Sequence, residues 1–337
     1  MTELNSKHEP LIIERYYGDM KVIDITLKND DQIITLSSLG ASIIKYQTKD
    51  RKGQFENIVL TYQNKEDYLD NPKFLGAVVG PFAGRIDPPV IHLNDRIYFL
   101  DKNHNNTVNL HSGVDTLTTK NFKVSDYDAS SVTFTYQALK NKTFPTYQIK
   151  VTYQLIKNQL ILTFESESRG HSVINPTQHS YFNLSGNLNK SIVNHNLKIP
   201  AQFRYETNQN AIPKALIPIM DTAFDFQEKK LIKDALTDID GIDHPYKLNQ
   251  GDIVLEDAIS GRILSISTDY DHLVVYTNND VTDHIFEPNV KDMKHLGICL
   301  ECQHVPNDLY LNAQPKSIVP PFTVKKNTIT YTHSITQ

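Results

Sequence analysis

Short stretches in which apolar and polar residues alternate recur along the whole chain, and this pattern constrains the fold more than any other feature. The clearest example is residues 147–156, where every second residue from 149 to 155 is apolar or aromatic. Such alternation is typical of an antiparallel strand with one buried face. Residues 159–165 repeat the pattern after Lys157 and Asn158, so the two stretches predict a β-hairpin.

The rest of the chain shows the same pattern of short alternating stretches. Further strands are predicted at 21–27, 32–37, 42–48, 57–62, 74–79, 90–93, 96–100, 121–127, 131–137, 252–267 (with a turn at Ser260 and Gly261) and 272–276. The proline-punctuated segment 199–218 is expected to be a long loop, and 226–236 is the best helical candidate. Many short, evenly spaced strands predict an all-β sandwich or barrel, and no linker divides residues 1–337 into two domains.

Composition and net charge indicate which classes of partner are not expected. The net charge is −5 and the lysines are scattered, so nucleic acid is not an expected partner. Neither an apolar signal-peptide region nor a run of about 18 apolar residues occurs, so no membrane association is expected. Two cysteines make no disulfide framework. These features predict a cytoplasmic protein. A monomer or a homodimer is expected, and the sequence does not distinguish between the two.

Residues 175–186 concentrate polar and aromatic groups around one histidine. If the stretch is extended, His179 and Tyr181 share a face with an amide and a hydroxyl. His179 is the one group of that face that exchanges a proton near neutral pH, so the face suits a polar pocket. A surface strand whose polar face meets water is an equally good interpretation of the pattern alone.

Glu301 lies in a second informative stretch, at 295–305. Read as a strand, Leu300 and Cys302 point to an apolar face, whereas Glu301 and Gln303 point to the opposite face and are able to line a cleft. An exposed strand glutamate is the commoner case. Cys299 and Cys302 resemble half of a zinc site, but they would point to opposite faces and have no second ligand pair, so no metal is expected.

Three further candidates lie in turn-like segments. His111 follows Asn109 and Leu110; Arg85 ends a glycine-containing segment, and Asp243 follows Gly241 and Ile242. Taken alone, His111 carries little information because most histidines are surface or satisfied residues, and Arg85 is better interpreted as a surface arginine. Asp243 is equally well an ordinary Asx-turn residue. Together with Glu301 and His179 they suit a small, uncharged, hydroxyl-rich ligand. The sequence contains no phosphate-binding loop and no dinucleotide fingerprint.

The run Asn-Pro-Thr-Gln-His-Ser-Tyr-Phe-Asn-Leu-Ser-Gly at 175–186 resembles a characteristic segment of the aldose 1-epimerases, the galactose mutarotases. Four other stretches match that family in the same order, at 80–86, 109–113, 241–245 and 301–306. Together they span most of the chain. The resemblance implies one large antiparallel β-supersandwich with an open cleft across a concave sheet, and few short helices.

The resemblance also implies roles for matched residues. Glu301 would be the general base that takes the C1 hydroxyl proton of a pyranose, and His179 the general acid that protonates the ring oxygen. His111 would assist near C1. Arg85, Asp243 and Tyr181 would hold sugar hydroxyls, and no cofactor would be required. A carboxylate and an imidazole suffice for reversible ring opening, because both transfers need pKa values near the working pH.

Several positions depart from the family pattern. Gly84 stands where asparagine is usual, the segment after Tyr276 lacks the usual glutamine, and Cys302 replaces a common threonine. The leading hypothesis is an aldose 1-epimerase acting on free galactose or glucose, a small-molecule sugar substrate. A non-catalytic sugar-binding protein on the same scaffold, and an epimerase for another, phosphorylated sugar, are the alternatives.

Overall fold

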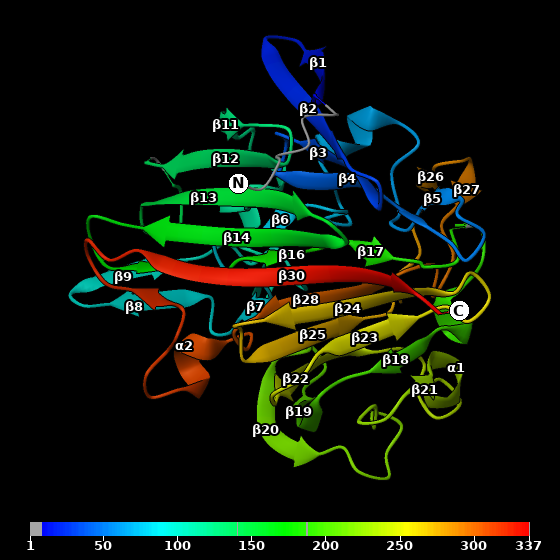
Figure 1. The fold of residues 1–337 in the computed structure, drawn as a ribbon. Helices are drawn as coiled ribbons and strands as arrows, with labels where there is room; N and C mark the ends of the chain where they lie inside the picture. Colours follow the sequence, from blue (N-terminus) through cyan, green and yellow to red (C-terminus); the bar gives the residue numbers. More distant parts are fainter. Residues whose placement is uncertain (1–8, 140, 187, 337) are drawn as a thin grey trace, which may run out of the picture.

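Strands dominate the computed structural model, which describes residues 9–139, 141–186 and 188–336 (Figure 1). Residues 1–8, which make up most of the N-terminal stretch in which no signal peptide is expected, lie outside the described part. The all-β class expected from the sequence is confirmed. Three larger sheets and several two-stranded ones make up the fold.

The largest sheet has nine strands and carries the long central strands of the molecule (Figure 1). Its order is β11 (Lys123–Tyr127), β12 (Ser131–Ala138), β13 (Tyr147–Ile156), β14 (Gln159–Glu167), β30 (Lys325–Ile335), β24 (Arg262–Thr268), β23 (Ile253–Glu256), β18 (Asn196–Lys198) and β21 (Lys230–Leu231). All its pairings are antiparallel. The predicted hairpin is β13–β14, confirmed with its turn at Lys157 and Asn158.

A six-stranded sheet contains the stretch around Glu301. Its order is β17 (Tyr181–Phe182), β28 (Ile298–Gln303), β25 (His272–Tyr276), β22 (Asp243–Leu248), β19 (Ala201–Thr207) and β20 (Pro213–Pro218). A five-stranded sheet runs in chain order through β1 (Leu11–Tyr17), β2 (Met20–Lys28), β3 (Gln32–Ser37), β4 (Ser42–Lys49) and β5 (Phe55–Asn57).

Short elements complete the described part. The two-stranded sheets pair β10 (Asn109–Leu110) with β7 (Arg85–Ile86), β16 (Thr177–Gln178) with β6 (Val78–Val79), β15 (Ser172–Val173) with β29 (Ile318–Val319), β26 (Ile285–Phe286) with β27 (Val290–Lys291), and β8 (Val90–Leu93) with β9 (Arg96–Phe99). The helical turns are α1 (Ile232–Ala235), α2 (Asp308–Leu311), η1 (Lys65–Tyr68), η2 (Gly113–Asp115), η3 (Leu117–Thr119) and η4 (Ile192–Asn194). None of the described helices is long and apolar enough to span a bilayer.

The apolar core lies between the six-stranded and nine-stranded sheets. Leu300 of β28 and Leu273 of β25 belong to the same buried cluster as Leu264 of β24 and Tyr331 of β30. The rings of Phe182 and Tyr331 have their centroids 5.7 Å apart across the two sheets. Because strand residues alternate between faces, burying this face of β28 and β25 turns the intervening residues toward the opposite side.

Three expectations from the sequence are wrong in detail. Residues 199–218 form β19 and β20 rather than a loop, and the prolines Pro213 and Pro218 lie at the ends of β20, an edge strand that tolerates them. The helix expected at 226–236 shrinks to α1. Of the strands expected at 57–62 and 74–79, only the end of β5 and the two residues of β6 lie in strands, while Val59 and Tyr62 form isolated bridges.

Candidate active site

A cavity of about 240 Å³ opens on the face of the six-stranded sheet that is turned away from the core. Strands β25 and β28 line its floor with Val274, Tyr276, Glu301 and Gln303. Its walls include Lys73, Phe74, Gly84, Arg85, His104, His111, His179, Tyr181, Asp243, Asp280, Thr282 and Pro306. All six residues singled out from the sequence therefore meet in one cavity, although up to 216 positions separate them in the chain (301 minus 85).

Glu301 and His179 face each other at the base of the cavity. Glu301 is 3% exposed and His179 is 4% exposed. The distance from His179 Nε2 to Glu301 Oε1 is 3.5 Å, which is long for a direct hydrogen bond. Both groups are therefore within reach of substrate oxygens placed beside them. The other ring nitrogen, His179 Nδ1, lies 3.6 Å from the Cys299 thiol sulfur.

Burial pushes the pKa values of this pair in opposite directions. It raises the pKa of Glu301 to about 8, an effect that Asp243 increases and Arg85 reduces. It lowers the pKa of His179 to about 4, because the imidazolium loses its hydration. Between these values the pair holds one proton, which is the inventory that a reversible acid–base exchange requires.

His111 lies beside His179 with its ring nearly perpendicular, at a centroid distance of 5.5 Å. Its Nδ1 accepts the Gly84 backbone N–H at 3.1 Å, so in the neutral ring Nε2 carries the proton. Burial lowers the pKa of His111 well below its usual range, and His179 and Arg85 lower it further. His111 is therefore a neutral donor, with Phe74 packed against its ring.

Arg85 and Asp243 form an ion pair at the rim. Arg85 Nη2 lies 3.1 Å from Asp243 Oδ2, and the two side chains are 17% and 29% exposed. Arg85 Nε is buried and finds no partner among the described residues. The pair thus offers a carboxylate and several N–H donors, the groups that bind sugar hydroxyls.

Tyr181 is more constrained than the sequence suggested. Its hydroxyl donates to the Lys73 carbonyl at 3.0 Å, so only its oxygen lone pairs remain available. Its ring lies 5.2 Å from that of His179, centroid to centroid. The described contacts of Tyr181 therefore position the His179 ring from one side.

Residues 175–184 of the stretch are all buried and only Ser185 and Gly186 are partly exposed, so its interpretation as a surface strand is wrong. Two of its polar residues bond to the backbone in or next to β28: Thr177 Oγ1 donates to the Cys302 carbonyl at 2.9 Å, and Asn183 Nδ2 to the Leu296 carbonyl at 2.8 Å. These bonds fix the stretch, and with it His179, against β28.

Cys299 and Cys302 are both free and buried. They pack in different apolar clusters, so they point to opposite faces of β28 as the strand interpretation predicted. The described residues contain no group of three or more potential metal-ligating side chains.

Lys73 was missed by the sequence reasoning. Its side chain is 4% exposed, and Nζ donates to Asp292 Oδ2 at 2.9 Å and to the Asp280 carbonyl at 2.8 Å. Asp292 also accepts from Thr282 N at 2.8 Å. Lys73 therefore anchors the segment that brings Asp280 and Thr282 to the cavity. A lysine between an asparagine–proline pair and a phenylalanine carries no local signal of this role.

Replacing Lys73 with methionine should destabilise the protein by about 3 kcal/mol, because the substitution leaves the Asp292 carboxylate buried without its cation. Urea unfolding followed by circular dichroism measures the effect. A double variant, Lys73→Met with Asp292→Asn, should recover part of the loss because it removes the uncompensated charge. An unchanged unfolding midpoint in the single variant would contradict this role.

Two departures from the family pattern have structural reasons in this chain. Gly84 has φ +80°, and a Cβ there would lie 2.8 Å from Pro306, so glycine suits both the backbone and the packing. After Tyr276, the chain turns back so that the Tyr276 hydroxyl donates to Asp280 Oδ2 at 3.0 Å. Asp280 and Thr282 thereby supply polar groups at the rim.

Known proteins resemble this chain over most of its length. The family described as aldose 1-epimerase matches residues 24–332. The galactose mutarotase of Mus musculus is 28% identical over 332 residues, covering 90% of this chain and 92% of the relative. The aldose 1-epimerase of Streptococcus thermophilus is 27% identical over 310 residues, covering 86% of this chain and 87% of the relative.

Solved structures agree on the fold. An aldose epimerase homologue from C. elegans superposes with a TM-score of 0.88 at 23% identity, covering 93% of this chain and 99% of the other. A galactose 1-epimerase from Lactobacillus acidophilus gives a TM-score of 0.85 at 24% identity, covering 97% and 99%. The family match and this architecture together show that the chain belongs to the aldose 1-epimerase family of isomerases, which interconvert the anomers of sugars.

Proposed function

We propose that this protein interconverts the α and β anomers of a free hexose, galactose or glucose, with Glu301 and His179 as the proton-transfer pair. The observation that carries the proposal is the placement of these two buried groups, 3.5 Å apart, in a cavity whose cationic side chains, Lys73 and Arg85, are each paired with a carboxylate. The relatives named galactose mutarotase support a hexose of this kind.

The reaction needs two coupled proton transfers. Glu301 takes the proton from the C1 hydroxyl while His179 gives a proton to the ring oxygen, and the bond between C1 and the ring oxygen breaks to leave the open-chain aldehyde. After rotation about the C1–C2 bond, the hydroxyl attacks the other face of C1. His179 then recovers its proton from this hydroxyl, and Glu301 returns its proton to the C1 oxygen.

One proton shared by Glu301 and His179 therefore suffices for the whole cycle. The bound substrate determines which of the two groups holds this proton when the reaction begins. The raised pKa of Glu301 and the lowered pKa of His179 place that proton on Glu301 in the empty site. A C1 hydroxyl that donates to the carboxylate, and a ring oxygen that accepts from the imidazolium, stabilise the opposite arrangement, because hydrogen bonds to a charged form favour that form. Substrate binding thus prepares the reactive state.

Rim residues would hold the remaining hydroxyls. Arg85 offers N–H donors and Asp243 a carboxylate, while His111 offers its Nε2 proton close to the reacting carbon. The ion pair between Arg85 and Asp243 balances the charge at the rim, and the buried Lys73 is already engaged by Asp292. A sugar phosphate would therefore find little uncompensated positive charge, so the cavity favours an unphosphorylated sugar.

The pH dependence of kcat/KM should be bell-shaped, with apparent pKa values of about 4 and about 8. Below the lower value His179 binds a second proton while Glu301 is already protonated, so no base remains. Above the upper value the pair loses its single proton, so no acid remains. Initial rates across this range test the prediction, and a main loss of activity between about pH 5 and 7 would contradict it.

Exchange NMR distinguishes this function from its competitors. The rate of magnetisation transfer between α and β anomeric protons is measured at equilibrium for galactose, glucose and glucose 6-phosphate, with and without protein. The proposal predicts faster exchange for a free hexose. Broadened sugar signals without faster exchange would instead indicate a binding protein, and faster exchange for the phosphate alone would indicate a different substrate.

A further inference from the structure

Gln303 lines the same cavity, and its side-chain amide forms no hydrogen bond with the described residues. The residue is 0% exposed, yet neither Oε1 nor Nε2 has a hydrogen-bond partner among the residues that the structure describes. Leaving a buried amide unpaired is costly, because it loses its hydrogen bonds to water without replacement. Apart from Arg85, no other residue lining this cavity has an unpartnered buried side-chain atom among those described.

A second buried glutamine, Gln178, differs because the protein itself satisfies its amide. Gln178 is also buried, but its Nε2 donates to the Gly76 carbonyl at 2.6 Å and its Oε1 accepts from Ser180 N at 2.8 Å. Its amide therefore serves the fold. The two glutamines are equally buried and differ in whether the protein itself satisfies them, and only Gln303 faces the cavity.

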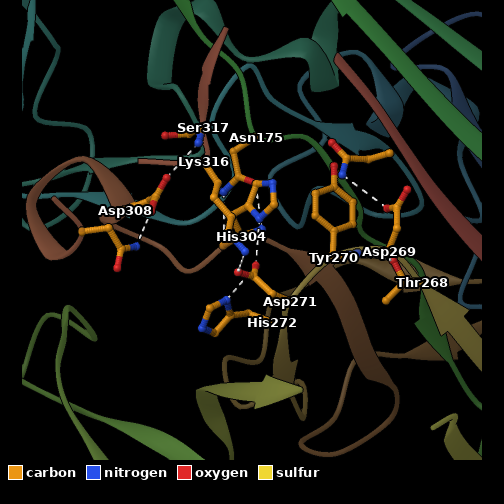
Figure 2. Close-up of polar contacts among 12 residues, drawn as sticks. Asn175, Thr268, Asp269, Tyr270, Asp271, His272, His304, Asp308, Lys316 and Ser317 are labelled. Atoms are coloured by element: carbon orange, nitrogen blue, oxygen red, sulfur yellow. Dashed lines mark hydrogen bonds and ion pairs between the residues drawn. The ribbon is translucent and has the colours of Figure 1, made fainter. Parts of the chain in front are cut away.

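The backbone around Gln303 is held firmly. Gln303 pairs with His272 of the neighbouring strand. The next residue, His304, exchanges two hydrogen bonds with Asn175: its N–H donates to Oδ1 at 2.9 Å and its carbonyl accepts from Nδ2 at 2.9 Å. Figure 2 shows this contact and the Asp271 carboxylate that binds both His304 and His272. The amide is therefore presented from a rigid position.

Gln303 also lies at a distinct end of the cavity. It is two residues beyond Glu301 on β28, about 7 Å along the strand. On its other side, the position of a Cβ at Gly84 would be 3.4 Å from Gln303 Nε2. The unpartnered Nε of Arg85, the residue after Gly84, belongs to the same wall. Two donors and one acceptor therefore remain unsatisfied in this part of the cavity.

We propose that Gln303 is a specificity-determining residue that binds a hydroxyl of the sugar other than the one on C1, its amide donating to and accepting from that hydroxyl. This inference rests on the proposed function for the orientation of the sugar. A neutral amide pair of this kind recognises a hydroxyl, which both donates and accepts, and it penalises a sugar that lacks the hydroxyl because the amide then stays unpaired.

The test compares Gln303→Met with Gln178→Met, two substitutions of similar shape. Gln303→Met should raise KM for the preferred hexose about 10- to 100-fold, with a smaller change in kcat. In the absence of sugar its melting temperature should equal or exceed that of the wild type, because an unpaired polar group is removed. Gln178→Met should melt at a lower temperature. A wild-type KM in Gln303→Met, or a loss of stability like that of Gln178→Met, would overturn the proposal.

Monodeoxy analogues of the hexose identify the hydroxyl. For the analogue that lacks it, wild type and Gln303→Met should bind equally, whereas the other analogues should keep the difference. A constant difference across all analogues would overturn the inference. Calorimetric titration measures these affinities without turnover. A wild-type protein that binds sugar but does not exchange anomers would therefore refute the proposed function, and the binding data would still test the role of Gln303.

Discussion

Glu301→Gln should lower kcat for anomer exchange by about 10²- to 10⁴-fold, the range expected when a positioned general base is removed. The amide keeps the shape of the side chain but has no basic oxygen able to accept the C1 proton. The nearby Cys299 thiol is not a replacement base, since burial raises its pKa well above its usual range. Initial rates of optical rotation change measure kcat directly.

The same variant should be more stable than the wild type at high pH, which separates a catalytic defect from a folding defect. Burial raises the pKa of Glu301 to about 8, so the folded protein holds this proton more tightly than the unfolded chain does. Stability is consequently lost as pH rises from the ordinary glutamate range to about 8. Glutamine does not titrate, so its melting temperature should exceed that of the wild type by a few degrees at about pH 9 and converge at about pH 5. A fully active Glu301→Gln enzyme would refute the assignment of the base.

His179→Asn should produce a loss of similar size, about 10²- to 10⁴-fold in kcat, because it removes the proton donor that faces Glu301 across 3.5 Å. His111 does not substitute, since its Nδ1 accepts from Gly84 and its pKa is lowered well below the usual range by burial. Asparagine still donates a hydrogen bond, so sugar binding should weaken less than turnover.

Combining the two substitutions provides the sharper test of a shared proton. If Glu301 and His179 act as one unit, the double variant should be about as slow as either single variant. Steady-state rates of the three proteins decide the point. Multiplicative losses would mean that the two groups act in separate steps, which would contradict the single-proton cycle.

Strand alternation predicted much of the arrangement at the site. It placed Glu301 and Gln303 on the face of β28 opposite Leu300 and Cys302, and the structure confirms this because the latter two are in the core while the former two line the cavity. The period of two is a local property of a strand, so a short stretch of sequence suffices to reveal it.

Strand alternation does not predict contacts between residues that are far apart in the sequence. The 3.5 Å approach of His179 to Glu301 depends on how β17 pairs with β28, and the residues alone contain no sign of that pairing. The resemblance to a known family brought these positions together. Alternation placed Gln303 on the cavity face but gave it no role, because an amide on a strand is usually solvent-exposed, and only its burial without a partner distinguishes it.

The edge strand β20 and the short helix α1 were also predicted incorrectly from the sequence. β20 was hidden by Pro213 and Pro218, since proline normally argues against a strand, but an edge strand needs only one hydrogen-bonded side. In 226–236, residues Lys230 and Leu231 pair with β18 instead of continuing a helix, so tertiary pairing overrides the local helical preference.

Polarimetry from both anomers tests the central claim most directly. Freshly dissolved α-D-galactose and β-D-galactose are followed separately with wild-type protein, with Glu301→Gln and with buffer, and glucose is run in parallel. The account predicts that wild type accelerates both approaches to the same final rotation and that Glu301→Gln leaves them close to the rate in buffer. Absence of acceleration with both hexoses, by a folded wild-type protein, would contradict it.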